Sequence, residues 1–475
     1  MPTLAKPVAH YKLPSIVRPF ARNRPAMSDT ATAPLPLKMA RLRGMMFMEY
    51  AVRGLWFPLA AKFLMADVSE GGLGFSREQM SYTLGIALAL GAITSPFVAG
   101  QIADRWFPTQ RFMGVLLILG GITKFATGYQ TSYEAWLTLS IIYAVLFMPT
   151  LGLSNSLAMA HLTDAKRQFP GVRVWGTIGW IVVSWLFPMI WLKSNISFQW
   201  LPPFFTGDDV PQLAGRMLDS VKAAGVLAIL YGLYSWFLLP HTPPKRSTNE
   251  LALGRALKVF SKGSMAVLAL ATLIVSSVHF IYFLETPTFL GVAGLGGAYI
   301  MPTMSIGQFA EIGMMAMLGW LLKSQGFRRV LMIGACCYAG RYLIFGLHEY
   351  LGLQVIIASQ ALHGPCFACF YAAAFIYIDR MSPEDVRHST QTLFALICFG
   401  IGPLASSQLN IALGAFCEVG SGDTATVDYS KFWLITSAIT LIGVGLLAML
   451  FKDETQNDSE ASSTATNLET PAEEI

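Results

Sequence analysis

The sequence has few charged residues for its length. Only 13% of its 475 residues are Asp, Glu, Lys or Arg, whereas 54% are hydrophobic. Soluble domains contain about 25% charged residues, so this chain cannot cover a globular surface with polar side chains. The same composition excludes intrinsic disorder of the chain as a whole. The hydrophobic side chains must therefore face lipid or one another.

Cysteine is also scarce, which excludes several classes of protein. The six cysteines all lie between residues 336 and 417, in or beside hydrophobic runs, so we expect no disulfide framework. Cys366 and Cys369 have the spacing of a metal-binding pair, but no second pair of ligands accompanies them. We expect no metal and no cofactor. The basic residues lie in short loops rather than on one soluble face, so nucleic acid is not expected as a partner.

Long hydrophobic runs recur along the chain. A run of about 20 residues can cross about 30 Å of hydrocarbon as a helix. The fold class is therefore predicted to be an all-α membrane protein with twelve transmembrane helices and both termini on one side. The predicted spans are 43–66, 79–103, 109–128, 134–160, 170–193, 218–239, 263–290, 298–323, 328–348, 351–379, 386–414 and 430–451.

The distribution of Lys and Arg predicts the orientation. With the N-terminus inside, 23 of the 33 basic residues fall in inner segments and five fall in or beside the outer loops. Cytoplasmic loops retain Lys and Arg, so we expect cytoplasmic N- and C-termini. We therefore expect a multi-pass protein of the inner, or plasma, membrane.

The longest inner connection divides the chain into two parts of similar length. Residues 240–262 form this basic cytoplasmic linker, between a first six-helix half at 43–239 and a second at 263–451. Residues 1–42 are basic and rich in proline, and we expect a disordered tail whose true start could be Met27. Residues 452–475 are acidic, rich in Ser and Thr, and also expected to be disordered.

A short motif follows the second predicted span. Gly100, Asp104 and Arg105 form a Gly-x-x-x-Asp-Arg pattern, and a degenerate copy lies at residues 319–329 after the eighth span. Glycine permits close helix approach, and the two charged residues can cap helix ends on the inner face. The motif resembles the loop signature of the major facilitator superfamily. The resemblance implies two six-helix halves around a central cavity.

Ionisable residues within a membrane span are costly and ask for a partner or a function. Glu311 lies at the middle of the eighth span, with Gln308 on the same helical face. A carboxyl at that depth suits a group that must bind and release a proton in each cycle. Glu49 and Arg53, four residues apart in the first span, can pair along one face, either structurally or at a cavity. Glu311 and Glu49 are the proton-coupling candidates.

Arg173, Thr177 and Trp180 form one stripe on the fifth span. A guanidinium, a hydroxyl and an aromatic ring can hold a small polar ring compound by hydrogen bonding and stacking. The alternative is that the stripe packs against a neighbouring helix through the nearby glycines. Lys124 lies near the outer end of the third span and is expected to reach the interface. Arg341, in the ninth span, is expected to serve packing.

Five segments together resemble a narrower family. They are 147–155, 169–180, 308–311, 363–370 and 381–391, which agree in order and spacing with the nucleoside:proton symporters of the major facilitator superfamily. The resemblance implies a transporter and not an enzyme, with nucleosides and protons as substrates and, we expect, a monomer in the bilayer. By position, the implied substrate-binding residues are Arg173, Thr177, Trp180, Gln308, Glu311, His363 and Phe367, with Trp180 where the family has Phe and His363 where it has Tyr.

The sequence departs from this family pattern at three further positions, where polar contacts are lost. Phe280 and Phe283 stand where the family has amide contacts, and Ala368 stands where it has a carboxylate. Glu49, His279 or Glu285 could supply the lost polar contacts. Two alternatives remain: a proton-coupled transporter of another small polar solute, such as a sugar, and a non-transporting membrane sensor on the same fold.

Overall fold

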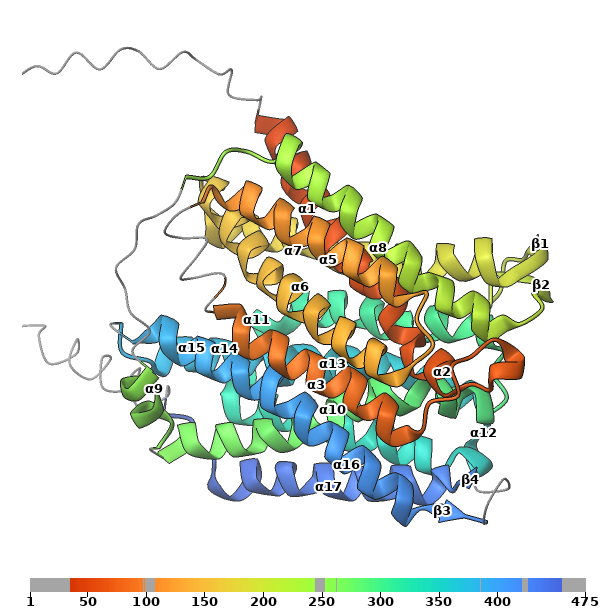
Figure 1. Ribbon diagram of the computed structural model, residues 1–475. Coiled ribbons are helices and arrows are strands. Elements are labelled where there is room, and N and C mark those ends of the chain that lie inside the picture. The colour runs from red at the N-terminus through yellow and green to blue at the C-terminus, as the bar shows by residue number, and fades with distance from the viewer. Residues whose placement is uncertain are drawn as a thin grey trace, which may run out of the picture.

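The structure of the chain, a computed structural model, is almost entirely helical. It describes residues 35–454 except 97, 99–106, 244–252, 262, 385 and 421–425. Most helices run side by side, with α1, α5, α7 and α8 of the first half in the upper part of Figure 1, α10, α16 and α17 of the second half in the lower part, and α3 of the first half among the second-half helices. The motif residues Gly100, Asp104 and Arg105 lie outside the described residues, as do residues 244–252 and 262 of the linker and residues 455–475.

The first half begins with an α-helix that continues into a short 3₁₀ helix at its C-terminal end. Its elements are α1 (Leu35–Trp56), η1 (Phe57–Leu59), α2 (Ala60–Met65), η2 (Val68–Glu70), α3 (Arg77–Pro96), α5 (Thr109–Thr127), α6 (Tyr133–His161), α7 (Ala165–Phe187), η4 (Pro188–Leu192) and α8 (Leu213–Leu238). An antiparallel hairpin of β1 (Lys193–Phe198) and β2 (Phe205–Asp209) joins η4 to α8, with Lys193 opposite Asp209.

The second half contains several helices that are interrupted by π-helical or 3₁₀ turns. Its elements are α9 (Leu253–Phe260), α10 (Gly263–Val292), η5 (Gly297–Tyr299), α11 (Ile300–Gly346), α12 (His348–Ser359), η6 (Gln360–Leu362), α13 (His363–Pro365), η7 (Cys366–Ala372), α14 (Ala373–Met381), α15 (Arg387–Leu396), η8 (Ile397–Ile401), α16 (Gly402–Phe416), β3 (Glu418–Val419), β4 (Thr426–Val427) and α17 (Tyr429–Leu450). Within α11, Gly326 has φ of 73°, a left-handed conformation that favours glycine. This residue divides α11 into two helical segments.

Two sequence predictions need correction. The first helix begins at Leu35, so residues 35–42 are helical and do not belong to a disordered tail. Pro36 is compatible with this start because proline fits the first turn of a helix. The fold also contains two short antiparallel hairpins that hydrophobic periodicity did not reveal.

Eight of the described helical segments are long and apolar enough to cross a membrane. They are Tyr133–His161, Arg167–Leu192, Leu213–Leu238, Gly263–Val292, Gly297–Gly346, His348–Met381, Arg387–Phe416 and Tyr429–Leu450. The first three predicted spans are not among them, and the segment Gly297–Gly346 combines two predicted spans. The structure therefore shows a multi-span helical protein, with fewer qualifying segments than the twelve predicted.

Glycines allow the helices of the first half to approach closely. The helix α1 packs against α7, and α5 packs against α8. A Cβ atom on Gly179 of α7 would lie 2.2 Å from the carbonyl oxygen of Phe47 in α1. A Cβ on Gly121 of α5 would lie 2.7 Å from the carbonyl oxygen of Gly225 in α8. Small residues at helix contacts are typical of membrane bundles, where close packing replaces the hydrophobic driving force.

The two halves meet through α3 against α16 and α7 against α11. Polar groups join them at the end of the bundle that carries the β1–β2 hairpin. Arg77 of α3 lies 3.0 Å from the buried carboxylate of Glu285 in α10, and that carboxylate also accepts hydrogen bonds from Asn410 and Tyr429. Trp185 of α7 donates to the hydroxyl of Ser305 in α11 at 2.9 Å. This end of the molecule is therefore closed by contacts between the halves.

Candidate functional site

The predicted stripe on α7 lies beside the glycines through which this helix packs against α1. Gly176 and Gly179 pack against Tyr50 and Phe47 of α1, so the glycines do serve helix packing. Arg173 is only partly buried, and its guanidinium lies 4.0 Å from the centre of the Tyr50 ring. Cation–π contact leaves the guanidinium N–H groups available to a ligand. The helix thus packs through its glycines while it presents Arg173.

Trp180 and Thr177 complete the α7 stripe. Trp180 lies against α1, where a Cβ on Gly54 would approach its ring to 3.0 Å. Thr177 is largely buried, with 8% of its surface exposed. The structure therefore gives Trp180 a clear packing role beside any contact with substrate.

Glu311 of α11 is a carboxyl without a bound partner. Among the described residues it has neither an ion pair nor a hydrogen bond, and its side chain is partly exposed. The charge of Arg173 acts on it across the gap between α7 and α11. Gln308, one turn away, is buried with its Oε1 atom unpartnered. Unpaired polar atoms at such a depth are costly unless a ligand satisfies them.

Close packing places His363 next to this part of α11. A Cβ on Gly307 would lie 2.7 Å from the Cβ of His363, and a Cβ on Gly364 would lie 2.5 Å from the backbone of Ala310. His363 of α13 therefore lies beside the segment of α11 that carries Gln308 and Glu311, while Phe367, one turn further along in η7, packs against the ring of Tyr371. From the first half of the molecule, the charge of Arg173 acts on Glu311 without forming an ion pair with it.

The state of His363 follows from its neighbour Arg341. The guanidinium of Arg341 is wholly buried, and its NH1 group lies 3.0 Å from Nδ1 of His363. Arginine can only donate, so Nδ1 must be the acceptor and the ring proton must be on Nε2. Arg341 thereby fixes the tautomer of His363, which leaves an N–H group as the only free polar atom of the ring. The sequence predicted only a packing role for Arg341.

Glu49 is held differently from Glu311. It is wholly buried, and its carboxylate accepts hydrogen bonds from Thr150 at 2.8 Å and Tyr231 at 2.9 Å. The ion pair predicted between Glu49 and Arg53 is absent from the salt bridges of the described residues. Arg53 instead lies 5.2 Å from the centre of the Phe57 ring. Hydroxyl groups from two other helices compete successfully for the carboxylate.

Glu285 and His279, which could have replaced the missing family contacts, form hydrogen bonds with other residues of the protein. Glu285 is held between the halves by Arg77, Asn410 and Tyr429. His279 is buried and accepts or donates one hydrogen bond with Tyr338 at 2.7 Å. Phe283, in place of a polar residue, packs its ring against Phe57 of the other half, with the ring centres 5.1 Å apart and the planes tilted by 41°. The aromatic replacement therefore contributes to the closed end of the molecule.

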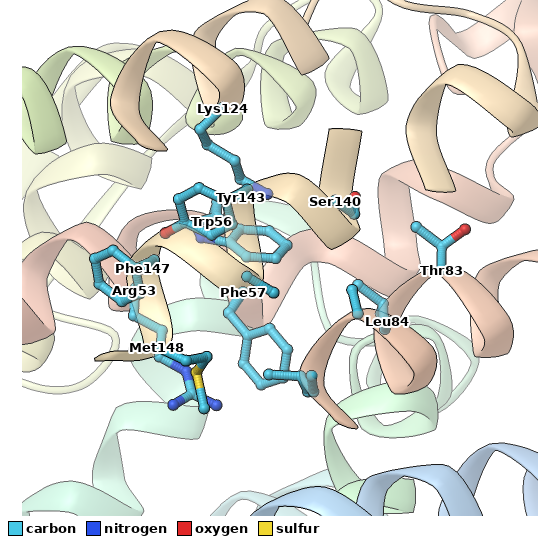
Figure 2. A pocket seen from close by; sticks show the side chains of 13 residues that line it. Arg53, Trp56, Phe57, Thr83, Leu84, Lys124, Ser140, Tyr143, Phe147 and Met148 are labelled. Atoms are coloured by element: carbon cyan, nitrogen blue, oxygen red, sulfur yellow. The ribbon is translucent and has the colours of Figure 1, made fainter. Parts of the chain in front are cut away.

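Lys124 departs furthest from its prediction. Its side chain does not reach the interface: it is wholly buried, with its ammonium 3.0 Å from the centre of the Trp56 ring. Figure 2 shows this side chain reaching toward Trp56 and Tyr143. Sequence reasoning missed this group because the aromatic partners come from two other helices. Neither spacing nor composition reveals that convergence.

The chain was compared with known protein families and structures. The family model described as nucleoside H⁺ symporter matches residues 37–456. The putative nucleoside transporter YegT of Escherichia coli K12 is 30% identical over 89% of this chain and 95% of its own length. The nucleoside permease NupG of the same strain is 23% identical over 87% of this chain and 95% of its own length.

Solved structures share the fold. The crystal structure of the nucleoside transporter NupG matches with a TM-score of 0.72 and 21% identity, over 87% of this chain and 99% of that one. The crystal structure of a D-xylose-proton symporter matches with a TM-score of 0.64 and 14% identity, over 88% and 98%. At these identities the structural matches show the fold alone, which is that of the major facilitator transporters.

Proposed function

This chain belongs to the nucleoside H⁺ symporter family, and from that premise we propose that Arg173, Glu311 and His363 carry its transport chemistry. The protein is a multi-pass membrane transporter that moves nucleosides together with protons, and not an enzyme. Such a transporter needs a site that holds the solute and a group that gains and loses a proton in each cycle.

We place twelve helices across the membrane. Eight segments qualify by length and composition, and Gly326 divides one of them into two. The helices α1, α3 and α5 supply the other three, because each lies in the bundle alongside a qualifying helix. The even number and the inner excess of Lys and Arg favour cytoplasmic termini in the inner membrane. The end closed by Arg77 and Glu285 is then the outer end.

The proposed nucleoside site combines donors, acceptors and rings from both halves. Arg173 and the Nε2–H group of His363 donate, and Gln308 offers its unpartnered Oε1 atom. Phe367 and Trp180 provide ring faces for stacking on a nucleobase. Thr177 is a further hydroxyl on the α7 side. No single half contains the whole set, so the solute would bridge the halves as they rock about it.

Glu311 is the proposed proton-coupling group. The single observation that carries this assignment is its free carboxyl, which faces the charge of Arg173 without contacting it. Loss of water around a carboxylate disfavours its charged form, while a nearby guanidinium favours it. Small changes in the distance to Arg173 therefore alternate proton uptake and release. Glu49 is the second candidate, although two hydroxyl groups hold it in place.

Replacement of Arg173 by lysine tests the binding site. Arg173→Lys retains the charge but loses the planar fork of donors, so we expect the Kd for uridine to rise about tenfold or more. Binding to purified protein measures this directly. Lys222→Met is the matched control, because Lys222 lies on α8, away from the α7 stripe, and pairs with Asp219 of the same helix. Unchanged affinity in Arg173→Lys would assign Arg173 a structural role.

The alternative of a sugar substrate has weaker support. The likeness to a D-xylose-proton symporter shows the shared fold alone. A non-transporting sensor is not favoured by the family to which the chain belongs. Competition of uridine uptake by hexoses distinguishes the first alternative, since a hexose that outcompetes every nucleoside would replace the nucleoside assignment.

A further inference from the structure

The first half of the molecule contains a pocket that the proposed nucleoside site does not use. It lies between α1, α3, α5 and α6 and has a cavity volume of about 30 Å³. Two cations, Arg53 and Lys124, line it together with the rings of Trp56 and Tyr143, as Figure 2 shows. None of its described lining residues is Asp or Glu. The pocket lining therefore has two basic side chains and no acidic one to pair with them.

Lys124 is the least satisfied of these residues. Its ammonium is wholly buried and makes no hydrogen bond within the described part of the chain. Its nearest partners are ring faces, 3.0 Å away at Trp56 and 4.8 Å away at Tyr143. Cation–π attraction recovers only part of the hydration that a buried ammonium loses. An acceptor for its protons is missing from the protein.

Other polar groups line the same pocket. The indole N–H of Trp56 interacts with the hydroxyl of Tyr143, and both residues are buried. Arg53, on the other side of these rings in Figure 2, has no ion pair among the described residues. Buried donors are nearly always satisfied, so the unpartnered ammonium of Lys124 indicates a ligand that offers an acceptor atom.

The nearest acid does not balance these charges. Glu49 is one turn from Arg53, but Thr150 and Tyr231 each donate to one of its oxygens. Glu49 is also not among the residues that line the pocket. The negative charge that the pocket lacks must therefore come from outside the described chain.

We propose that this pocket is an anion-binding subsite, in which Lys124 holds a small anionic group beside the ring of Trp56. Two sources supply that chemistry. One is the transported solute, a nucleoside whose base has lost a proton, and this source rests on the proposed function. The other is a free inorganic anion such as chloride. The charge of Arg53 also acts on Glu49 and on His279 of the second half, so an occupant would be sensed at the interface between the halves.

Binding measurements with purified protein in lipid nanodiscs test the first source. The probes are xanthosine, whose base ionises near neutral pH, and inosine, which stays neutral there. The parent protein should bind ionised xanthosine about tenfold or more tightly than inosine. Lys124→Met should remove that preference and leave inosine binding unchanged, whereas Lys124→Arg should retain it. Lys222→Met is the control, since its ammonium is paired with Asp219.

Replacement of chloride by gluconate tests the second source. If a free anion occupies the pocket, the thermal midpoint and uridine uptake of the parent fall in gluconate, and Lys124→Met loses this dependence. Monodisperse elution and a thermal midpoint no lower than that of the parent in gluconate show that Lys124→Met is folded.

The subsite is overturned if the parent neither prefers ionised xanthosine nor responds to chloride, or if Lys124→Met retains both effects. Proton-driven uridine uptake in the same preparations separates the two claims. Its presence without any anion effect removes only the subsite, whereas its absence removes the nucleoside symport itself.

Discussion

At the scale of single residues, the two carboxyls proposed for proton coupling differ in how they are held. Glu49 is fixed by two hydroxyl donors, while Glu311 has no partner among the described residues. Glu311→Gln is nearly isosteric but cannot gain or lose a proton. We expect vesicles with this variant to lose uridine accumulation up a gradient, while exchange of uridine across the membrane persists.

Glu49→Gln is the matched comparison for this prediction. It should reduce uptake less, because an amide can keep one of the two hydroxyl contacts. Accumulation that survives in Glu311→Gln and disappears in Glu49→Gln would move the coupling role to Glu49.

The Arg341–His363 contact gives a second prediction at this scale. Asparagine at position 363 can accept from Arg341 as Nδ1 does, but it lacks the Nε2–H group. Glutamine can place a donor near Nε2, but it leaves the wholly buried Arg341 without that acceptor. We expect His363→Asn to raise the Kd for uridine about tenfold and His363→Gln to lower the thermal midpoint more. The reverse order would show that His363 serves packing and not substrate binding.

At the scale of elements, the sequence predicted helices where long hydrophobic runs are continuous. The ends of α10 and α17 agree with their predicted spans within two residues. The start of α1 was misplaced because its first turn, with Pro36 and Lys38, follows a proline-rich basic stretch and lacks a continuous hydrophobic run. The π-helical turns at η7 and η8 were not predicted, since they depend on tertiary packing rather than on hydrophobic periodicity.

The ion pair between Arg77 of α3 and Glu285 of α10 leads to a prediction about the end of the bundle that it closes. Glu285→Gln leaves the partly buried Arg77 without its counter-ion, so the closed arrangement should lose stability relative to the open one. Cys417, buried beside Arg77, is a natural reporter of this change. A membrane-impermeant maleimide should label Cys417 faster in Glu285→Gln than in the parent. Cys417→Ser identifies the labelled site, and an unchanged rate would show that this ion pair does not hold the end closed.

At the scale of the whole molecule, the candidate site could be predicted only in part. Family resemblance indicated Arg173, Gln308, Glu311, His363 and Phe367, and in the structure His363 packs beside the segment of α11 that carries Gln308 and Glu311. It could not locate the partners of Lys124, Glu49 or Arg341, because each contact joins helices that are distant in sequence. A single sequence shows which polar residues enter the membrane, but not which groups they meet there.

Uptake of labelled uridine into vesicles reconstituted with the purified protein tests the central claim most directly. With the vesicle exterior more acidic than the interior, we predict uridine accumulation above its external concentration, and loss of that accumulation when a protonophore dissipates the gradient. Empty vesicles control for leakage. Uridine that only equilibrates, at the same rate with and without the pH gradient, would contradict proton-coupled nucleoside symport.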